Sequence, residues 1–180
     1  MPRSLGRLLT AGGLIGLTAA FVLTVEKIAL LKDPAYVPSC SINPVLSCGS
    51  IMNTPQAELF GFPNPLLGIA GFAIVTTVGV VLLAGVVPPR WFWLGLQAGV
   101  TAGAVFVHWL IFQSLYVIGA LCPYCMVVWA VTMPLFWYVT LRNVNAKRLR
   151  DYHAVPLVLW FLTVIALIGV RFQTYWSSLL

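Results

Sequence analysis

Four cysteines form two pairs that are spaced to exchange disulfides. Cys122 and Cys125 make the motif Cys-Pro-Tyr-Cys at the start of an apolar segment. On a helix this spacing places both sulfurs on one face, one turn apart, where they can bond. The positive end of the helix dipole favours a thiolate there, which makes such a cysteine a good nucleophile or leaving group. Cys40 and Cys48 form the second pair, in a segment rich in proline.

Three chemistries are compatible with these pairs. A Cys₄ zinc site needs converging thiolates, usually within hydrophilic turns, which the apolar surroundings of Cys122 and Cys125 disfavour. Two inert disulfides are the second reading, but a Cys-x-x-Cys bridge closes so small a loop that it adds little stability. The third is a relay, in which Cys40 and Cys48 take electrons from an outside thiol protein and pass them on by disulfide exchange. We therefore predict four catalytic cysteines and no metal.

The composition indicates which class of protein must position these cysteines. The chain has 180 residues, of which 61% are hydrophobic and 8% charged, whereas a soluble domain carries about a quarter charged residues. Apolar runs of the roughly 17–25 residues that cross a bilayer recur along the chain. The sequence predicts an all-α polytopic membrane protein with five spanning helices, the first not a cleaved signal peptide. The expected spans are residues 8–31, 65–87, 91–118, 122–141 and 155–176.

The basic residues predict the orientation of these helices. If the chain crosses five times, one side of the membrane receives Arg3, Arg7, Arg90, Arg142, Lys147, Arg148 and Arg150, and the other receives Lys27, Lys32 and Arg171. Cytoplasmic loops are enriched in Lys and Arg, so the N-terminus is expected in the cytoplasm of a cell with this protein in its plasma or inner membrane. All four cysteines then lie on the outer face, where disulfides persist. The same placement explains the positive charge without nucleic-acid binding.

Residues 32–64 form the long loop of this arrangement. Its five prolines predict an ordered but irregular course. We expect Cys40 and Cys48 to be accessible from outside in this loop and able to swing inward. Apolar residues in its second half could place a short segment over the mouth of the bundle as a lid. These residues are Ile51, Met52, Leu59, Phe60 and Phe62.

The relay needs a terminal electron acceptor inside the membrane. No Gly-x-Gly-x-x-Gly nucleotide fingerprint is present, and His108 and His153 are too few and too far apart to ligate haem. By elimination, a lipid-soluble quinone is the expected two-electron acceptor. Proton delivery to the quinol by Glu26, Lys27 or His108 is one possibility. The favoured roles are structural: Lys27 extends to the membrane interface, Glu26 packs beside an interfacial partner, and His108 is a neutral, hydrogen-bonded histidine.

The cysteine motifs resemble those of the vitamin K epoxide reductase family. The matching residues are Cys40-x₇-Cys48, Asn64-Pro-Leu-Leu-Gly68 before the second span, and Cys122-Pro-Tyr-Cys125. The resemblance covers about residues 14–141 and is strongest to the bacterial branch with five spanning helices. The DsbB family resembles the chain less, because its Cys-x-x-Cys lies in the first outer loop.

The resemblance implies an architecture and partners. A four-helix catalytic bundle over residues 1–150 would surround a membrane quinone of the menaquinone or ubiquinone type, and residues 151–180 would supply a fifth spanning helix outside it. Some bacterial relatives carry a fused thioredoxin-like domain, which is not expected here. The thiol donor would then be a separate DsbA-like or thioredoxin-like protein, secreted or anchored in the membrane.

The resemblance also implies a role for each site residue. Cys125 would face the quinone, Cys122 would exchange with the shuttle pair in the loop, and Asn64 would hydrogen-bond a quinone carbonyl. The family often has a tyrosine four residues after the second active-site cysteine, where this chain has Trp129. A hydrogen bond to quinone from that side would therefore come from the indole N–H.

The predicted function is quinone-dependent thiol–disulfide oxidation that supports disulfide formation outside the cytoplasm. Two alternatives remain open on the sequence. One is reduction of vitamin K epoxide or a quinone as the primary substrate, and the other is a non-enzymatic membrane scaffold stapled by disulfides.

Overall fold

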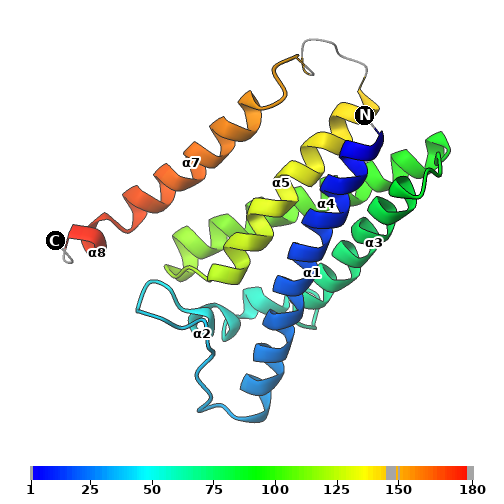
Figure 1. Ribbon diagram of the computed structural model, residues 1–180. Helices are drawn as coiled ribbons and strands as arrows, with labels where there is room; N and C mark the ends of the chain where they lie inside the picture. Colours follow the sequence, from blue (N-terminus) through cyan, green and yellow to red (C-terminus); the bar gives the residue numbers. More distant parts are fainter. Residues whose placement is uncertain (1, 145–148, 150, 178–180) are drawn as a thin grey trace.

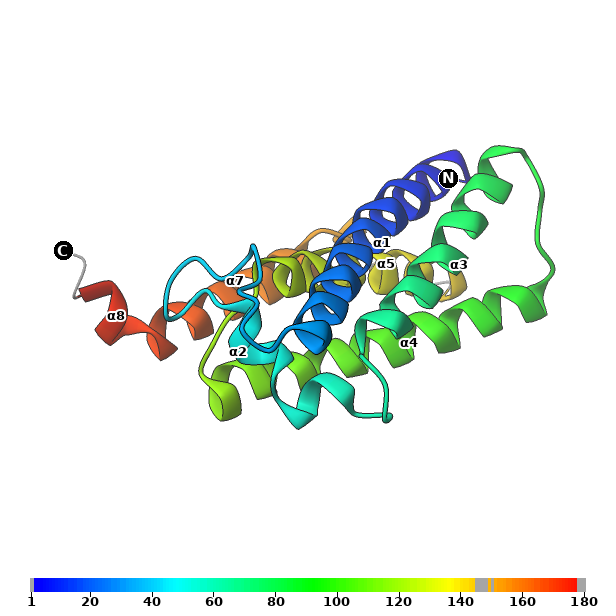
Figure 2. The same ribbon diagram turned by 90° about the horizontal axis from the view of Figure 1, so that it is seen from below.

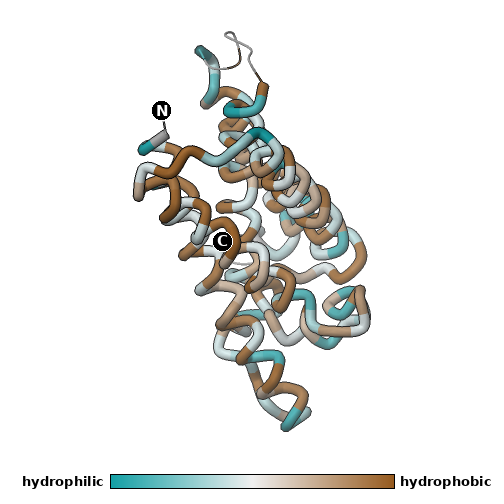
Figure 3. The backbone as a smooth tube through the Cα atoms, turned by 90° about the vertical axis from the view of Figure 1, so that its right-hand side faces the viewer, coloured by the Kyte–Doolittle hydropathy of each residue, from teal (hydrophilic) through white to brown (hydrophobic). Residues whose placement is uncertain are grey.

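Four long helices dominate the computed structural model, which describes residues 2–144, 149 and 151–177 (Figures 1 and 2). They are α1 (Pro2–Lys32), α3 (Pro65–Leu83), α4 (Arg90–Phe112) and α5 (Pro123–Asn143). Helix α1 packs against α3 and α5, and α5 packs in turn against α4. All four are long and apolar enough to cross a membrane, and hydrophilic residues gather toward their ends and connections (Figure 3). The predicted all-α polytopic membrane fold is confirmed.

The fifth predicted span differs from the expectation. Helix α7 (Val155–Arg171) has 17 residues, at the lower limit for crossing a bilayer. The chain leaves helical geometry at Phe172 and continues as the short helix α8 (Gln173–Ser177). The expected continuous helix to residue 176 is therefore wrong. Figure 1 shows α7 along one side of the bundle, where Trp160 Nε1 donates a hydrogen bond of 2.9 Å to His108 Nε2 on α4.

One other predicted helix end differs for a local reason, and the span predicted to end at residue 118 does so with a change of helix type. Helix α3 ends at Leu83 rather than at residue 87, because Gly85 adopts a left-handed conformation with φ of 88° that terminates it. The helix that begins at Arg90 changes after Phe112 into the π-helix η2 (Gln113–Ile118). Gly119, also left-handed, then turns the chain into α5.

Small residues allow α1 and α3 to approach closely. Gly13 of α1 lies against Thr76, and Gly16 lies against the ring of Phe72. A Cβ atom at Gly13 would lie 2.8 Å from the backbone nitrogen of Thr76, closer than real contacts permit. Such close approach is a main source of helix association in lipid, where the hydrophobic effect between helices is lost.

Helices α3 and α4, in contrast, enclose space between them. They lack the close packing of the other neighbouring pairs in the described chain. Gly71 on α3 and Gly95 and Gly99 on α4 face a cavity, and a Cβ atom at any of the three would meet nothing within 4 Å. The bundle is thus tight along α1 and open between α3 and α4.

The loop after α1 folds over the end of the bundle. Ser47 caps the one-turn helix α2 (Cys48–Met52) by accepting a hydrogen bond from the Ser50 nitrogen, and the 3₁₀ turn η1 (Pro55–Glu58) follows. Ile51, Met52, Leu59 and Phe60 line the cavity from this side, as expected of a lid.

Replacing Gly13 by valine should separate α1 from α3, because the added methyl groups have no space beside Thr76. We expect the protein to lose about 1–3 kcal/mol of stability, typical of overpacking, measured by thermal unfolding in detergent. Gly169→Val on α7 is the matched control, since nothing lies within 4 Å of a Cβ atom there. Equal effects of the two changes would contradict this account of the interface.

Candidate functional site

The cysteine sulfurs of both pairs meet at one end of the bundle. Cys40 and Cys48 are joined by a disulfide, and Cys122 and Cys125 are reduced. The Sγ atom of Cys48 lies 3.0 Å from the Sγ atom of Cys122. Since disulfide exchange requires one sulfur to reach another, the two pairs stand in contact for exchange, and Cys48 is the loop cysteine that makes the contact.

A short parallel β-bridge brings Cys48 to this position. Leu46 pairs with Leu121; the Ser47 nitrogen donates to the Leu121 oxygen at 2.8 Å, and the Leu121 nitrogen donates to the Val45 oxygen at 2.7 Å. Cys48 and Cys122 follow immediately on their two strands. The register of two backbone hydrogen bonds therefore selects the sulfur that faces Cys122.

The expected accessibility of the loop cysteines is wrong for this state. The residue exposures of Cys40 and Cys48 are 4% and 0%, and both lie in an apolar cluster with Leu23, Leu30 and Met52. They are covered because the loop folds back onto α1 and the start of α5 rather than projecting from them. A protein partner can reach Cys40 only after part of the loop moves.

Cys122 occupies the N-cap of α5, with Pro123 in the first turn. A hydrogen bond from the Cys125 thiol lowers the pKa of the Cys122 thiol; burial raises it by less, and the backbone N–H groups of Cys125 and Tyr124 lower it further. The helix start thus stabilises a thiolate at Cys122, as the Cys-Pro-Tyr-Cys motif predicted. A stabilised thiolate is a better leaving group in disulfide exchange.

Glu26 of α1 holds the loop segment that precedes Cys40. Its carboxylate accepts hydrogen bonds from the Tyr36 hydroxyl at 2.8 Å and from the hydroxyl and backbone nitrogen of Ser39. The bond to Glu26 raises the pKa of the Tyr36 hydroxyl. Glu26 is buried within the chain, and these donors compensate its negative charge. The partner that the sequence led us to expect for Glu26 is therefore the loop.

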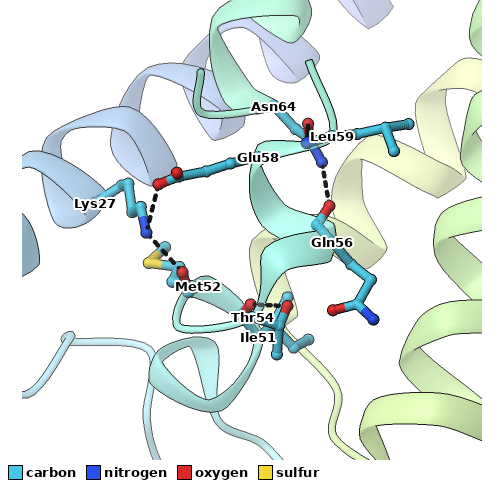
Figure 4. Close-up of polar contacts among 8 residues, drawn as sticks. All are labelled: Lys27, Ile51, Met52, Thr54, Gln56, Glu58, Leu59 and Asn64. Carbon is cyan, nitrogen blue, oxygen red and sulfur yellow. Dashed lines mark hydrogen bonds and ion pairs between the residues drawn. The ribbon is translucent and has the colours of Figure 1, made fainter. Parts of the chain in front are cut away.

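Lys27, the next residue, holds the segment that follows Cys48 (Figure 4). Its ammonium donates to the Met52 oxygen at 2.7 Å and pairs with the Glu58 carboxylate at 2.9 Å. The expected extension of Lys27 to the membrane interface is wrong, because the loop supplies a carboxylate and a carbonyl close to α1 and the side chain remains buried. Two adjacent residues of opposite charge thus fix the two arms of the redox loop.

Beside the sulfurs lies an apolar cavity of about 1090 Å³, lined by α3, α4, α5 and the lid. Cys122, Cys125 and Trp129 reach it from α5. Trp129 is 3% exposed, and its indole N–H has no hydrogen-bond partner among the described residues. An unpaired buried donor is costly, but the nitrogen itself is enclosed by protein atoms, so a carbonyl group in the cavity would reach it only if the indole turned. The size and the apolar lining fit a quinone, whose ring is flat and whose tail is hydrocarbon.

Asn64 lies at the cavity but is already engaged by the lid. Its Nδ2 donates to the Gln56 oxygen at 2.7 Å, and its Oδ1 accepts from the Leu59 nitrogen at 3.1 Å (Figure 4). The amide therefore positions the segment from Gln56 to Leu59 over the cavity and retains one N–H for a ligand. Its expected bond to a quinone carbonyl stays a prediction.

Sequence reasoning missed Gln113. Its side chain lines the cavity from the π-helix η2 and has no hydrogen-bond partner within the described chain. π-Helical turns are frequent at functional sites, but the sequence gives no sign of this one; a lone amide in an apolar span is the only signal. His108, in contrast, contacts Ala104 O at 2.7 Å through Nδ1 and accepts from Trp160 at Nε2. It is a hydrogen-bonded histidine, as predicted.

The described chain thus combines helices that can cross a membrane with a loop disulfide and a reduced cysteine pair in sulfur contact. The chain matches the vitamin K epoxide reductase family over residues 7–140, and it belongs to that family. The thiol-disulfide oxidoreductase LTO1 of Arabidopsis thaliana is 22% identical over 128 residues, which cover 67% of this chain. The chain spans 33% of the length of that curated relative.

The sulfur contact makes a direct prediction about cross-linking. With Cys40→Ser and Cys125→Ser, Cys48 and Cys122 should join under mild oxidation, detected by mass spectrometry of digested protein. With Cys48→Ser and Cys125→Ser, the bond between Cys40 and Cys122 should form more slowly, because Cys48 is the sulfur in contact with Cys122 and proximity affects the rate. Equal rates, or the reverse order, would remove Cys48 from the exchange.

Proposed function

We propose that this protein oxidises a dithiol protein outside the cytoplasm and transfers the two electrons to a membrane quinone. The observation that carries the proposal is the 3.0 Å contact between Cys48 and Cys122 at the mouth of an apolar cavity. One side of this contact is covered by a loop that would have to move to admit a protein, and the other faces a space for a lipid-soluble molecule. The sulfurs thus provide a path for electrons between two substrates that do not contact each other.

The proposed relay begins with Cys122 and Cys125 joined by a disulfide. A partner thiolate attacks Cys40 and releases the Cys48 thiolate, which attacks Cys122 and releases the Cys125 thiolate. The second partner thiolate then frees Cys40, and the partner leaves as a disulfide. Cys40 attacks Cys48 and releases Cys122. The result is the state described above, with the loop pair oxidised and two electrons held on Cys122 and Cys125.

The chain's own residues support each step. The lowered pKa of Cys122 favours its release in the last exchange. Cys125 and Trp129 lie one helical turn apart on α5 and both line the cavity, which supports Cys125 as the thiolate that faces the acceptor. Bound there, a quinone of the menaquinone or ubiquinone type would accept two electrons and two protons. Asn64 and Gln113 offer N–H groups to its oxygens, and Trp129 would do so if its indole turned.

The proposed orientation places the cysteine end of the bundle outside the cytoplasm. It rests on the basic residues near the opposite end, such as Arg3, Arg7 and Arg90. Lys147, Arg148 and Arg150, which add to this bias, lie outside the described residues. The proposed partner is a DsbA-like or thioredoxin-like protein, secreted or membrane-anchored, because its exposed thiols would enter at Cys40.

The decisive experiment removes the loop pair. Cys40→Ser together with Cys48→Ser should abolish oxidation of a DsbA-like protein, because that partner cannot reach Cys122 beneath the loop. Dithiothreitol is small enough to reach Cys122 and Cys125, so its oxidation should continue at a measurable rate. Quinone reduction is followed by absorbance with each reductant.

Two controls make the result specific. Cys125→Ser should lose activity with both reductants, and Ile42→Ala, in the loop between Cys40 and Cys48 with an exposed side chain, should retain most activity with both. Normal oxidation of the protein partner by the loop double variant would show that the Cys40–Cys48 disulfide is structural and that electrons enter elsewhere.

Trp129→Phe tests the unpaired indole N–H. The phenyl ring keeps an aromatic wall and removes the donor, so quinone reduction should fall by about tenfold, in line with one hydrogen bond of about 1 kcal/mol that strengthens as charge develops on oxygen. Stability should be unchanged or slightly higher, because an unsatisfied donor is lost. Unchanged kinetics at limiting and at saturating quinone would exclude this contact.

A further inference from the structure

Three sulfurs converge at the redox contact, and in the fully reduced protein all three would be free thiols. The Sγ atoms of Cys40, Cys48 and Cys122 all lie within 4.8 Å of one another, and all three residues are buried. Disulfide exchange aligns these three sulfurs only transiently, as attacking, central and leaving atoms, when Cys40 attacks Cys48 and releases Cys122. Cys125 does not belong to this cluster within the described residues, although it is the partner of Cys122 in the chain.

The loop is fixed by contacts that do not depend on its disulfide. Ser39, before Cys40, is bound to Glu26, and the Ser41 hydroxyl after it accepts a hydrogen bond from Gly49 at 3.2 Å. On the other arm, Ser47 is held by Leu121 in the β-bridge. Reduction of the Cys40–Cys48 bond therefore leaves both cysteines beside Cys122, with their Cα atoms about as far apart as the 5.6 Å seen in the oxidised state.

The geometry points to a three-thiolate site for a soft divalent cation, Zn²⁺ or Cd²⁺, in the fully reduced protein. Metal–sulfur bonds of about 2.3 Å place thiolates about 3.8 Å apart, a spacing that small side-chain rotations give from the present cluster. Three thiols release three protons when the cation binds, and the complex carries one negative charge. The N-terminus of α5 at Cys122 lies beside this negative charge, and its partial positive charge stabilises the complex.

The site would exist in one redox state only. The oxidised loop offers no thiolate from Cys40 or Cys48, so the disulfide must first accept two electrons from the thiol partner or an added reductant. A bound cation would hold Cys48 and Cys122 together as ligands and prevent their exchange. This consequence for turnover rests on the proposed function, whereas binding itself does not.

Cadmium titration of the full-length chain in detergent tests the site. The protein is reduced with a phosphine, which is then removed without oxygen, and Cd²⁺ binding is read from its thiolate charge-transfer absorption. One Cd²⁺ per chain is expected, and none with the loop disulfide intact. Cys40→Ser, Cys48→Ser and Cys122→Ser should each weaken binding by more than the 10–100-fold typical of lost outer-shell contacts. Cys125→Ser should bind as the parent chain does.

A measurement on the unaltered protein tests the same site without relying on variants that could misfold. Bound Cd²⁺ should protect Cys40, Cys48 and Cys122 from alkylation and leave Cys125 reactive, as counted by mass spectrometry. Absence of saturable binding, binding by the oxidised chain, or loss of binding in Cys125→Ser would overturn the proposal; the last result would indicate an ordinary two-thiol site at Cys122 and Cys125. No quinone or partner protein enters these assays, so their outcome is independent of the proposed relay.

Discussion

Two backbone hydrogen bonds between residues 45–47 and Leu121 determine which sulfurs can react. The segment before Cys48 and the segment before Cys122 come from distant parts of the chain, and each is too short to form a sheet. Their parallel register nevertheless holds Cys48 in contact with Cys122. Because Cys48 begins α2 directly after the bridge, a shift of one residue in the pairing would move the start of that helix and carry the Cys48 sulfur away from Cys122.

The loop that carries this bridge is held by charge rather than by its own secondary structure. Glu26 and Lys27, adjacent on α1, bind its two arms on either side of the disulfide. Buried charges are expensive unless they are fully paired, and here the carbonyl, hydroxyl and carboxylate groups of the loop pair them. The same contacts that compensate Glu26 cover Cys40, so the structure couples the stability of the loop to protection of its disulfide.

The helices beneath the loop pack closely on one side of α3 and leave a cavity on the other. Glycines allow α1 to pack tightly against α3, whereas Gly71, Gly95 and Gly99 leave space between α3 and α4. That space continues to Cys125 and Trp129, and the amides of Asn64 and Gln113 give the mostly apolar lining a few polar points. Glycine therefore serves close packing on one side of α3 and an open cavity on the other.

The sequence by itself determined the membrane fold, the two cysteine pairs and the family. Long apolar runs have few stable alternatives to helices in lipid, and Cys-x-x-Cys at a helix start fixes a local geometry that needs no distant contact. Helix ends such as Leu83 and Arg171 were missed because turns of one or two residues decide them. Tertiary structure alone decided that Cys48 faces Cys122, that Lys27 turns inward to Glu58, that Asn64 supports the lid and that Gln113 lines the cavity. Each of these depends on residues far apart in the chain, and no local pattern records which distant group a buried polar atom will find.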